Sequence, residues 1–158
     1  MQLQALDLSE IVRAANERYA PQAGLASKRI VCELPPSLPS VRGDERWLPL
    51  VLDNLISNAV KYTKDGGTIT LKVEDRGELV LVSVGDDGIG VPEEDREKVF
   101  ERFHRSANGR FTPGTGLGLA IAREVVQRHG GKIWCEPGQP KGTRFSIVIP
   151  VDSAKVAA

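Results

Sequence analysis

The sequence predicts an α+β domain, a two-layer α/β sandwich with about three helices on one face of a mixed sheet of about five strands. Two patterns lead to this class. Segments with helical periodicity precede and separate segments with strand character, and several strand segments are joined by short turns. Short turns favour antiparallel pairing over a doubly wound parallel sheet. The length of 158 residues suits one domain and is too short for two of ordinary size.

The first half of the chain predicts two helices separated by a short strand. The first helix begins near Ser9, and the strand spans 28–34, where prolines end it. The second helix begins after Asp44, a favourable N-cap residue, and ends at 64–67 in a pair of glycines. The apolar faces consist of Ile11, Val12, Ala15 and Tyr19 in the first helix and of Trp47, Leu48, Val51, Leu52, Leu55 and Ile56 in the second.

The second half predicts four strands and two more helices. Residues 68–74 alternate apolar and polar side chains, and a turn at 75–77 leads to 79–84, which is almost continuously apolar, as in a central strand. The later elements are a short helix over 93–100, a helix over 117–129 and strands over 132–136 and 143–150. We expect residues 152–158 to form a disordered tail, so the domain covers 1–151.

Composition and charge disfavour several classes of protein. Lys+Arg and Asp+Glu are both 21, so the formal net charge is zero, which argues against a nucleic-acid binder held by bulk charge. No apolar run approaches the ~20 residues of a membrane span, and residues 1–7 lack a signal-peptide pattern. Cys32 and Cys135 suit a reducing compartment. His104 and His129 are the only histidines, too few for a His-rich zinc site.

Polar side chains gather on one face of the second helix. Asn54, Asn58, Lys61 and Tyr62 fall within about 100° of one another, opposite the apolar face. Two amide oxygens one turn apart suit Mg²⁺, and a lysine one turn further on supplies a cation for phosphate. The tyrosine supplies a flat surface. The alternative is a solvated polar face that ends in a lysine.

An acidic, glycine-containing segment, Asp86-Asp87-Gly88-Ile89-Gly90, directly follows the apolar strand. Its glycines allow a ligand to approach the backbone closely. An aspartate at a strand end can accept a hydrogen bond from an exocyclic amine such as adenine N6. Taken alone, however, the segment is better explained as a tight acidic turn.

A glycine-rich run, Gly114-Thr115-Gly116-Leu117-Gly118-Leu119, leads straight into a helix. Backbone N–H groups at a helix N-terminus can cradle an anion. The run is not a dinucleotide-binding fingerprint, because Leu119 stands where glycine or alanine is required, and it lacks the Gly-Lys-Ser/Thr of a P-loop. A flexible linker is the alternative, but such linkers seldom carry leucine at alternate positions. Together the three patterns predict a nucleotide site.

The order of these motifs, with Phe100 and Phe103 between the second and the third, resembles the ATP-binding catalytic domain of bacterial sensor histidine kinases. That domain has the Bergerat fold, which it shares with the gyrase, heat-shock chaperone and mismatch-repair ATPases of the GHKL superfamily. The resemblance covers residues from about 6 to 150. It implies ATP and Mg²⁺ as cofactors, an ATP lid over about 104–116, and protein-histidine kinase activity.

The resemblance also implies a role for each motif residue. Asn58, together with Asn54, would bind Mg²⁺, and Asn54, Lys61 and Arg105 would be catalytic. Asp86 would accept the adenine amine, and Phe100 and Phe103 would anchor the lid. The residues implied to contact ATP are Asn58, Lys61, Tyr62, Asp86, Gly88, Ile89, Gly90, Phe103, Arg105, Thr115, Gly116, Leu117, Gly118, Leu119 and Thr143.

One position bears on the reaction. In the hydrolysing relatives a glutamate stands one turn before the metal-binding asparagine and activates water. Asn54 stands there in this sequence, and its amide cannot act as a general base at neutral pH. The pattern therefore implies phosphoryl transfer to another group, with slow hydrolysis.

No His-Glu-rich helical hairpin, which carries the phosphoacceptor histidine of these kinases, is present in the sequence. His104 falls in the predicted lid, and His129 falls at a helix end, where it suits the helix dipole. We therefore expect a catalytic domain that transfers the γ-phosphoryl group of ATP to a histidine on a dimerisation hairpin absent from this chain.

The resemblance implies a response regulator downstream. The isolated domain is expected to be a cytoplasmic monomer without a nucleic-acid partner or direct membrane contact, whether or not its parent kinase is membrane-anchored. Three alternatives keep the fold. They are a serine/threonine kinase of the anti-sigma factor type, an ATP-gated clamp module, and a non-catalytic domain that retains an ATP pocket.

We expect residues 104–116 to be the most mobile internal segment of the free domain and to become ordered around the triphosphate of ATP. The segment contains little apolar material besides Phe111, so its contacts do not offset the about 1–2 kcal/mol of backbone entropy that ordering costs per residue. Amide hydrogen exchange without nucleotide, and then with a non-hydrolysable ATP analogue and Mg²⁺, checks this. Protection in the free protein, or equal exchange in both states, would contradict a lid there and the role of Arg105.

Overall fold

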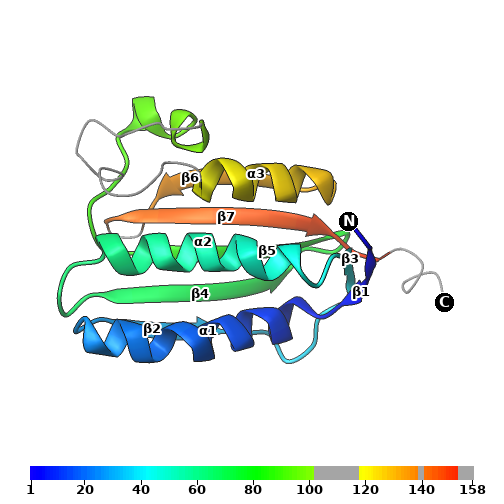
Figure 1. Cartoon of the computed structure of the whole chain (residues 1–158), viewed down its shortest axis with the longest axis horizontal. Helices are drawn as coiled ribbons and strands as arrows, with labels where there is room; N and C mark the ends of the chain where they lie inside the picture. Colours follow the sequence, from blue (N-terminus) through cyan, green and yellow to red (C-terminus); the bar gives the residue numbers. More distant parts are fainter. Residues whose placement is uncertain (102–117, 139–140, 153–158) are drawn as a thin grey trace.

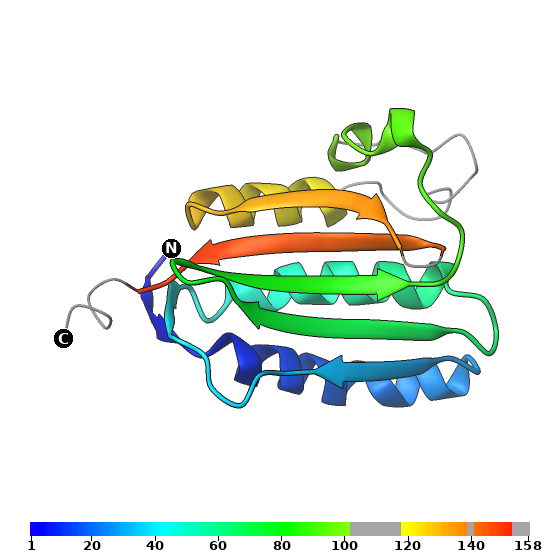
Figure 2. The same cartoon turned by 180° about the vertical axis from the view of Figure 1, so that it is seen from behind.

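The computed structural model describes residues 1–101, 118–138 and 141–152. Three α-helices of this part of the chain cover one face of a five-stranded sheet, and the other face is open (Figures 1 and 2). The helices are α1 (Leu8–Leu25), α2 (Trp47–Tyr62) and α3 (Gly118–Arg128). The predicted two-layer α+β class is therefore confirmed.

The sheet has the strand order β2-β4-β5-β7-β6. Its strands are β2 (Arg29–Glu33), β4 (Thr68–Asp75), β5 (Leu79–Asp86), β6 (Lys132–Pro137) and β7 (Thr143–Pro150). Only β2 and β4 are parallel, and the other neighbours are antiparallel. The mixed sheet is thus mostly antiparallel, as the short turns predict.

The core lies between the sheet and the helices. Strand alternation places every second side chain toward the helices, and the register aligns Leu71, Val84, Phe145 and Cys135 in one row across four strands. All four side chains are buried. The ring of Phe100 packs edge-on against Phe145, with the centroids 5.9 Å apart. This contact attaches the segment after β5 to the core.

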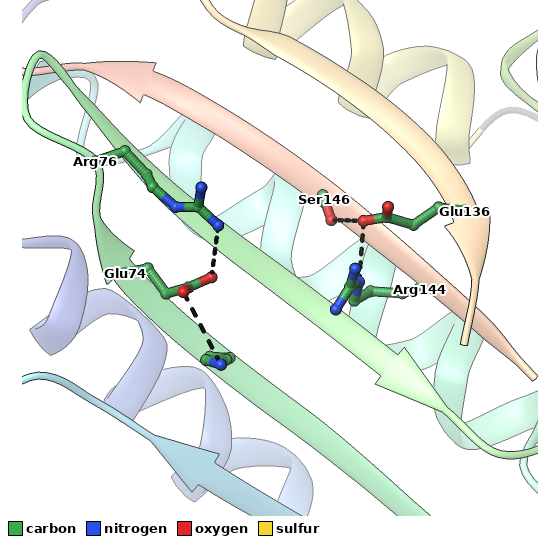
Figure 3. Close-up of polar contacts among 6 residues, drawn as sticks. Glu74, Arg76, Glu136, Arg144 and Ser146 are labelled. Atoms are coloured by element: carbon green, nitrogen blue, oxygen red, sulfur yellow. Dashed lines mark hydrogen bonds and ion pairs between the residues drawn. The ribbon is translucent and has the colours of Figure 1, made fainter. Parts of the chain in front are cut away.

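The open face of the sheet carries charged side chains in ion pairs (Figure 3). Glu136 accepts hydrogen bonds from Arg144 Nε and Ser146 Oγ, both 2.9 Å long. Burial opposes ionisation of Glu136, but these bonds outweigh it, so the pKa of this carboxyl lies below its ordinary value. Glu74 pairs with Arg76 at 3.3 Å. Charged residues thus cover a face that no helix covers among the described residues.

Several elements differ from the sequence prediction. A two-stranded antiparallel sheet of β1 (Gln4–Leu6) and β3 (Val41–Gly43) was not predicted, because strands of three residues carry no usable alternation. The predicted helix over 93–100 is instead two 3₁₀ turns, η1 (Glu93–Asp95) and η2 (Lys98–Phe100). A segment this short does not recover the cost of nucleating an α-helix.

Asp152, the first residue of the predicted disordered tail, belongs instead to the folded domain. Asp152 is buried, and its N–H donates to the Ser40 carbonyl at 2.8 Å. The rest of the expected tail, 153–158, lies outside the described residues. So does the whole of the predicted lid, 104–116, which includes His104. Among the described residues, no helix is both long and apolar enough to cross a membrane.

Different elements lie at the two ends of the domain. In Figure 1, α2 ends and β7 begins on the left, and α3 begins above the middle of α2. The N-terminus, β1 and β3 lie at the opposite end, on the right. The fold therefore brings the polar face of α2, the acidic segment and Gly118, which are far apart in the chain, to the same half of the helical layer.

The core packing predicts a difference between neighbours on β7. Ile147 is 1% exposed on the helix-covered side, whereas Val148 is half-buried on the open side. We expect Ile147→Ala to lower the free energy of unfolding by about 2–5 kcal/mol through lost burial and a cavity. The matched control Val148→Ala should cost no more than about 1 kcal/mol. Urea unfolding followed by circular dichroism measures both, and equal losses would contradict the assignment of the two faces.

Candidate functional site

Helix α2 brings the first group of predicted site residues together. Its apolar side is buried against the core through Leu48, Val51, Leu52, Leu55, Ile56 and Ala59. On its other side Asn54, Asn58 and Tyr62 are half-buried and Lys61 is exposed. The predicted division into an apolar and a polar face is confirmed, so the two amides and the lysine are available on one side of the helix.

Asn54 connects α2 to the start of α3. Its Nδ2 donates to the Gly118 carbonyl at 3.1 Å, which fixes the orientation of the amide. A Cβ atom on Gly118 would lie 3.4 Å from Asn54 Oδ1, at van der Waals distance. The last glycine of the glycine-rich run and the start of α3 thus lie directly beside Asn54. The Asn54 side-chain oxygen also lies next to Gly118.

Asn58 has an unsatisfied amide. Its Nδ2 is buried and has no hydrogen-bond partner among the described residues. A buried N–H without an acceptor is costly, so a ligand or an ordered water that accepts its hydrogen bond would be stabilising. This is the kind of atom expected at a binding site that is completed by its ligand.

Asp86 lies at the end of β5 on the helix-covered side and is 5% exposed. Its Oδ1 accepts the Gly88 N–H at 3.1 Å, so the side chain closes the turn that follows the strand. The carboxylate is thereby held in one orientation. Its place in the row opposite Ile69 and Thr143 puts it at the edge of the core, next to the end of α2.

Gly88 of the acidic segment is required by the packing of the protein itself. A Cβ on Gly88 would lie 1.9 Å from the Tyr62 carbonyl oxygen, so no other residue lets this turn meet the end of α2. A Cβ on Gly90 would lie 3.2 Å from the Gly142 carbonyl oxygen, a tight contact that a shift of a few tenths of an ångström would relieve. The sequence predicted that these glycines admit a ligand. The structure adds a second role, because the backbone of the acidic segment meets the backbone at the end of α2.

Two residues at this end were not singled out from the sequence. Gly142 has φ +87°, a left-handed conformation, and its missing side chain makes room for the Asp86 carbonyl. Asp87 Oδ2 accepts the Thr68 N–H at 3.1 Å, which ties the end of β5 to the start of β4. In the sequence, neither a Gly-Thr pair before a strand nor a second aspartate is a strong indication of a site residue. Their contacts become visible only in the folded structure.

Thr143 and Ile89 are placed together. The buried Thr143 hydroxyl donates to the Ile89 carbonyl at 3.4 Å. The Ile89 side chain is 41% exposed, so an apolar surface is open to solvent directly after Asp86. Thr143 therefore holds the turn of the acidic segment through the Ile89 carbonyl.

The start of α3 supplies backbone donors. The first N–H groups of a helix have no partner within it, and the helix dipole favours an anion there. Leu119 is buried in the core, so any contact of this residue with a ligand would be through its backbone. Phe103, Arg105, Thr115, Gly116 and Leu117 lie outside the described residues.

The donor set fits Mg²⁺ only with help from a ligand. Among the described residues, no three His, Cys, Asp or Glu side chains gather to hold a metal ion. Asn58 and the Asn54 oxygen are hard donors of the kind that Mg²⁺ takes in combination with phosphate oxygens and water. The site therefore suits a nucleotide-bound Mg²⁺ ion and not a metal held by protein alone.

The sequence matches a family model described as histidine kinase-, DNA gyrase B-, and HSP90-like ATPase over residues 43–153. It is 49% identical over 111 residues to the sensor histidine kinase WalK of Bacillus subtilis, covering 68% of this chain and 18% of WalK. It is 39% identical over 152 residues to the sensor-like histidine kinase SenX3 of Mycolicibacterium smegmatis, covering 94% of this chain and 39% of SenX3. The chain thus spans less than half of either relative.

Solved structures agree with the sequence matches. The catalytic domain of histidine kinase ThkA, in a nucleotide-free form, aligns with a TM-score of 0.85 and 32% identity over 96% of this chain and 99% of that chain. The mycobacterial sensor histidine kinase MprB aligns with a TM-score of 0.80 and 32% identity, over 94% and 98%. The chain therefore belongs to the histidine kinase-, DNA gyrase B- and HSP90-like ATPase family, and its relatives place it among the catalytic domains of sensor histidine kinases.

Proposed function

We propose that this domain binds Mg²⁺-ATP between α2, the acidic segment and the start of α3, and transfers the γ-phosphoryl group to a histidine on a dimerisation hairpin. The observation that carries the proposal is the convergence of the Asn54–Gly118 contact, the unsatisfied Asn58 amide and the buried Asp86 in the same half of the helical layer. The structure of full-length histidine kinase ShkA with AMPPNP, 30% identical to this chain, supports a nucleotide in this fold.

In this proposal Asp86 accepts the adenine amine. The Gly88 N–H holds its carboxylate in place, so no reorientation is needed when the base binds. Ile89 and Tyr62 pack against the base, with Gly90 and Thr143 holding the turn. Specificity for adenine then comes from one charge-assisted hydrogen bond inside a mostly apolar recess.

The phosphates lie toward α3. Lys61 and the N–H groups from Gly118 onward contact them, and Asn58 and Asn54 hold the Mg²⁺ ion, which neutralises charge on the transferring phosphoryl group. From outside the described residues, Arg105, Phe103, Thr115, Gly116 and Leu117 are proposed to complete the site. The protein's part in the reaction is to position the phosphates and to exclude water.

Transfer is favoured over hydrolysis by the state of Asn54. Its Nδ2 donates to the Gly118 carbonyl, so the side chain is committed to a structural contact and has no basic group to activate water. This separates the proposal from an ATP-gated clamp that hydrolyses its nucleotide. A serine/threonine kinase on the same fold remains the second candidate, because the site described here does not contact the acceptor.

The partners follow from the proposed reaction. The acceptor is a phosphoacceptor-histidine hairpin, in the same parent chain or in trans, and a response regulator receives the phosphoryl group from it. The complex of histidine kinase ThkA with response regulator TrrA, 30% identical to this chain in its kinase, supports this class of partner. Since ATP is the donor, we place the reaction in the cytoplasm.

Replacing Asp86 tests the adenine contact. Asp86→Asn keeps an oxygen that can accept the Gly88 N–H but weakens the acceptor for the adenine amine, so ATP should bind on the order of 10- to 100-fold more weakly, for a loss of about 1.5–3 kcal/mol. Asp87→Asn is the matched control, with the same charge change one residue away. Calorimetric titration with Mg²⁺ and AMPPNP measures both, and an unchanged affinity in Asp86→Asn would show that Asp86 serves only the turn.

The isolated chain should bind Mg²⁺-ATP without labelling itself, because the acceptor hairpin is absent from its sequence. Incubation with γ-labelled ATP, alone and with purified hairpin fragments of related kinases, checks this. Label on the hairpin that is lost in acid and stable in base identifies phosphohistidine. Acid-stable label would favour the serine/threonine kinase, and stable label on the chain alone would contradict the absence of self-phosphorylation.

A further inference from the structure

His129 links the end of α3 to the turn that leads into α2, at the end of the domain opposite the proposed nucleotide site. It is 7% exposed, and its Nε2 accepts the Asp44 backbone N–H at 3.0 Å. Its Nδ1 is 2.8 Å from the Val125 carbonyl oxygen in the last turn of α3. The sequence predicted His129 only as a partner for the helix end, and the contact with Asp44 is additional.

The two contacts define the state of the ring. Because the Asp44 N–H is a donor, Nε2 must be unprotonated, and because the Val125 carbonyl is an acceptor, Nδ1 must carry the hydrogen. A neutral imidazole in one tautomer satisfies both. The ring therefore accepts one backbone hydrogen bond, from Asp44, and donates another, to Val125. An apolar side chain of similar size could make neither bond.

Asp44 is itself rigidly held. Its carboxylate accepts N–H groups of Arg46 at 2.8 Å, Trp47 at 3.3 Å and Gln2 at 2.7 Å. The Arg46 bond above all holds the pKa of this carboxyl below its usual value, against the effect of burial. Asp44 therefore holds the turn that leads into α2, whose N-cap is Arg46 and not the predicted Asp44. It gives His129 a fixed point just before that helix.

Gly43 and α2 both pack next to His129. A Cβ on Gly43 would lie 2.5 Å from Leu48 Cδ1 and 3.3 Å from His129 Cδ2. Between its ends, α3 is buried through Ala122, Val125 and Val126 and packs against α2. Figure 1 shows the two helices side by side along their length.

Both ends of α3 are thus joined by polar contacts to α2 or to the residues just before it. Asn54 holds Gly118 at the nucleotide end, and Asp44 holds His129 at the other. An α-helix of 11 residues spans about 16 Å and is stiff on this scale. If the last turn of α3 shifts relative to α2, the whole helix, including Gly118, is therefore expected to shift with it.

We propose that His129 is a positioning residue for nucleotide binding: by accepting the Asp44 N–H it fixes α3 along α2, and so holds Gly118 beside Asn54. This inference rests on the proposed function, because it takes the Asn54–Gly118 contact as part of the ATP site. His129 touches neither nucleotide nor metal in this account, and its effect passes through α3.

The test compares three replacements of His129 with the wild-type chain. His129→Gln retains an oxygen acceptor and an N–H donor at the end of the side chain. His129→Leu fills much of the space without either group, and His129→Asn can reach Val125 but not Asp44. The readouts are affinity for AMPPNP with Mg²⁺ and hydrogen exchange at residues 122–126 without nucleotide, both well below the unfolding midpoint of each variant.

We expect His129→Leu and His129→Asn to bind the nucleotide roughly 3- to 30-fold more weakly and to exchange faster at 122–126 than the wild type. His129→Gln should restore both toward the wild-type values. If His129→Leu does not fold, His129→Asn decides the outcome. Lower thermal stability with unchanged affinity and unchanged local exchange would overturn the proposal and leave His129 a structural residue.

The two proposals fail in different ways. If the wild-type chain did not bind AMPPNP at all, the proposed function would fail, yet the exchange at 122–126 would still report whether His129 positions α3. If the wild type bound and all three variants bound equally well, the function would stand and the positioning role of His129 would be rejected.

Discussion

Helix α2 places apolar side chains against the sheet and polar side chains on its opposite face, and the rest of the domain is arranged around it. Leu48, Leu55 and Ile56 must face the sheet, while Asn54 and Asn58 must face away from the core. Because a helix offers fixed angles between residues, these demands fix its rotation about its own axis. Once α2 is seated, the positions of α3 and of the acidic segment follow from their contacts with it.

The second constraint is that backbones meet at the end of α2. The turn after β5 reaches the Tyr62 carbonyl only because residue 88 is glycine, and the turn before β7 reaches Asp86 only because residue 142 is glycine. This packing holds Asp86 in a buried position with its carboxylate already hydrogen-bonded to Gly88. A rigid acceptor needs little reorganisation when a ligand binds, which is how a single side chain can select a base.

Much of the fold could be predicted from the sequence because its main elements have a clear period. The alternation of β4 and the two faces of α2 are visible in the chain, and the motif order pointed to the family. The polar face of α2 and the turn after β5 could be predicted because each motif is continuous in sequence. The β1–β3 pair could not, since strands of three residues show no period.

Contacts between distant residues were also beyond the sequence. Asp44 and His129 are 85 positions apart, and nothing local marks them as partners. The same holds for Asn54 and Gly118, whose contact sets where α3 begins. Gly88 was expected to admit a ligand, and the structure adds a packing reason that only the folded arrangement reveals. Such pairings are properties of the tertiary fold.

The central claim is that a nucleotide joins the amides of α2, Asp86 and the start of α3. Nuclear magnetic resonance of the ¹⁵N-labelled chain, titrated with Mg²⁺ and AMPPNP, measures it at each residue. We expect the side-chain amides of Asn54 and Asn58 and the backbone amides of Gly88 and Gly118 to shift together. Shifts confined instead to the open face of the sheet, around Thr70, Ser83 and Arg144, where residues of β4, β5 and β7 line a hollow of about 340 Å³, would contradict the account.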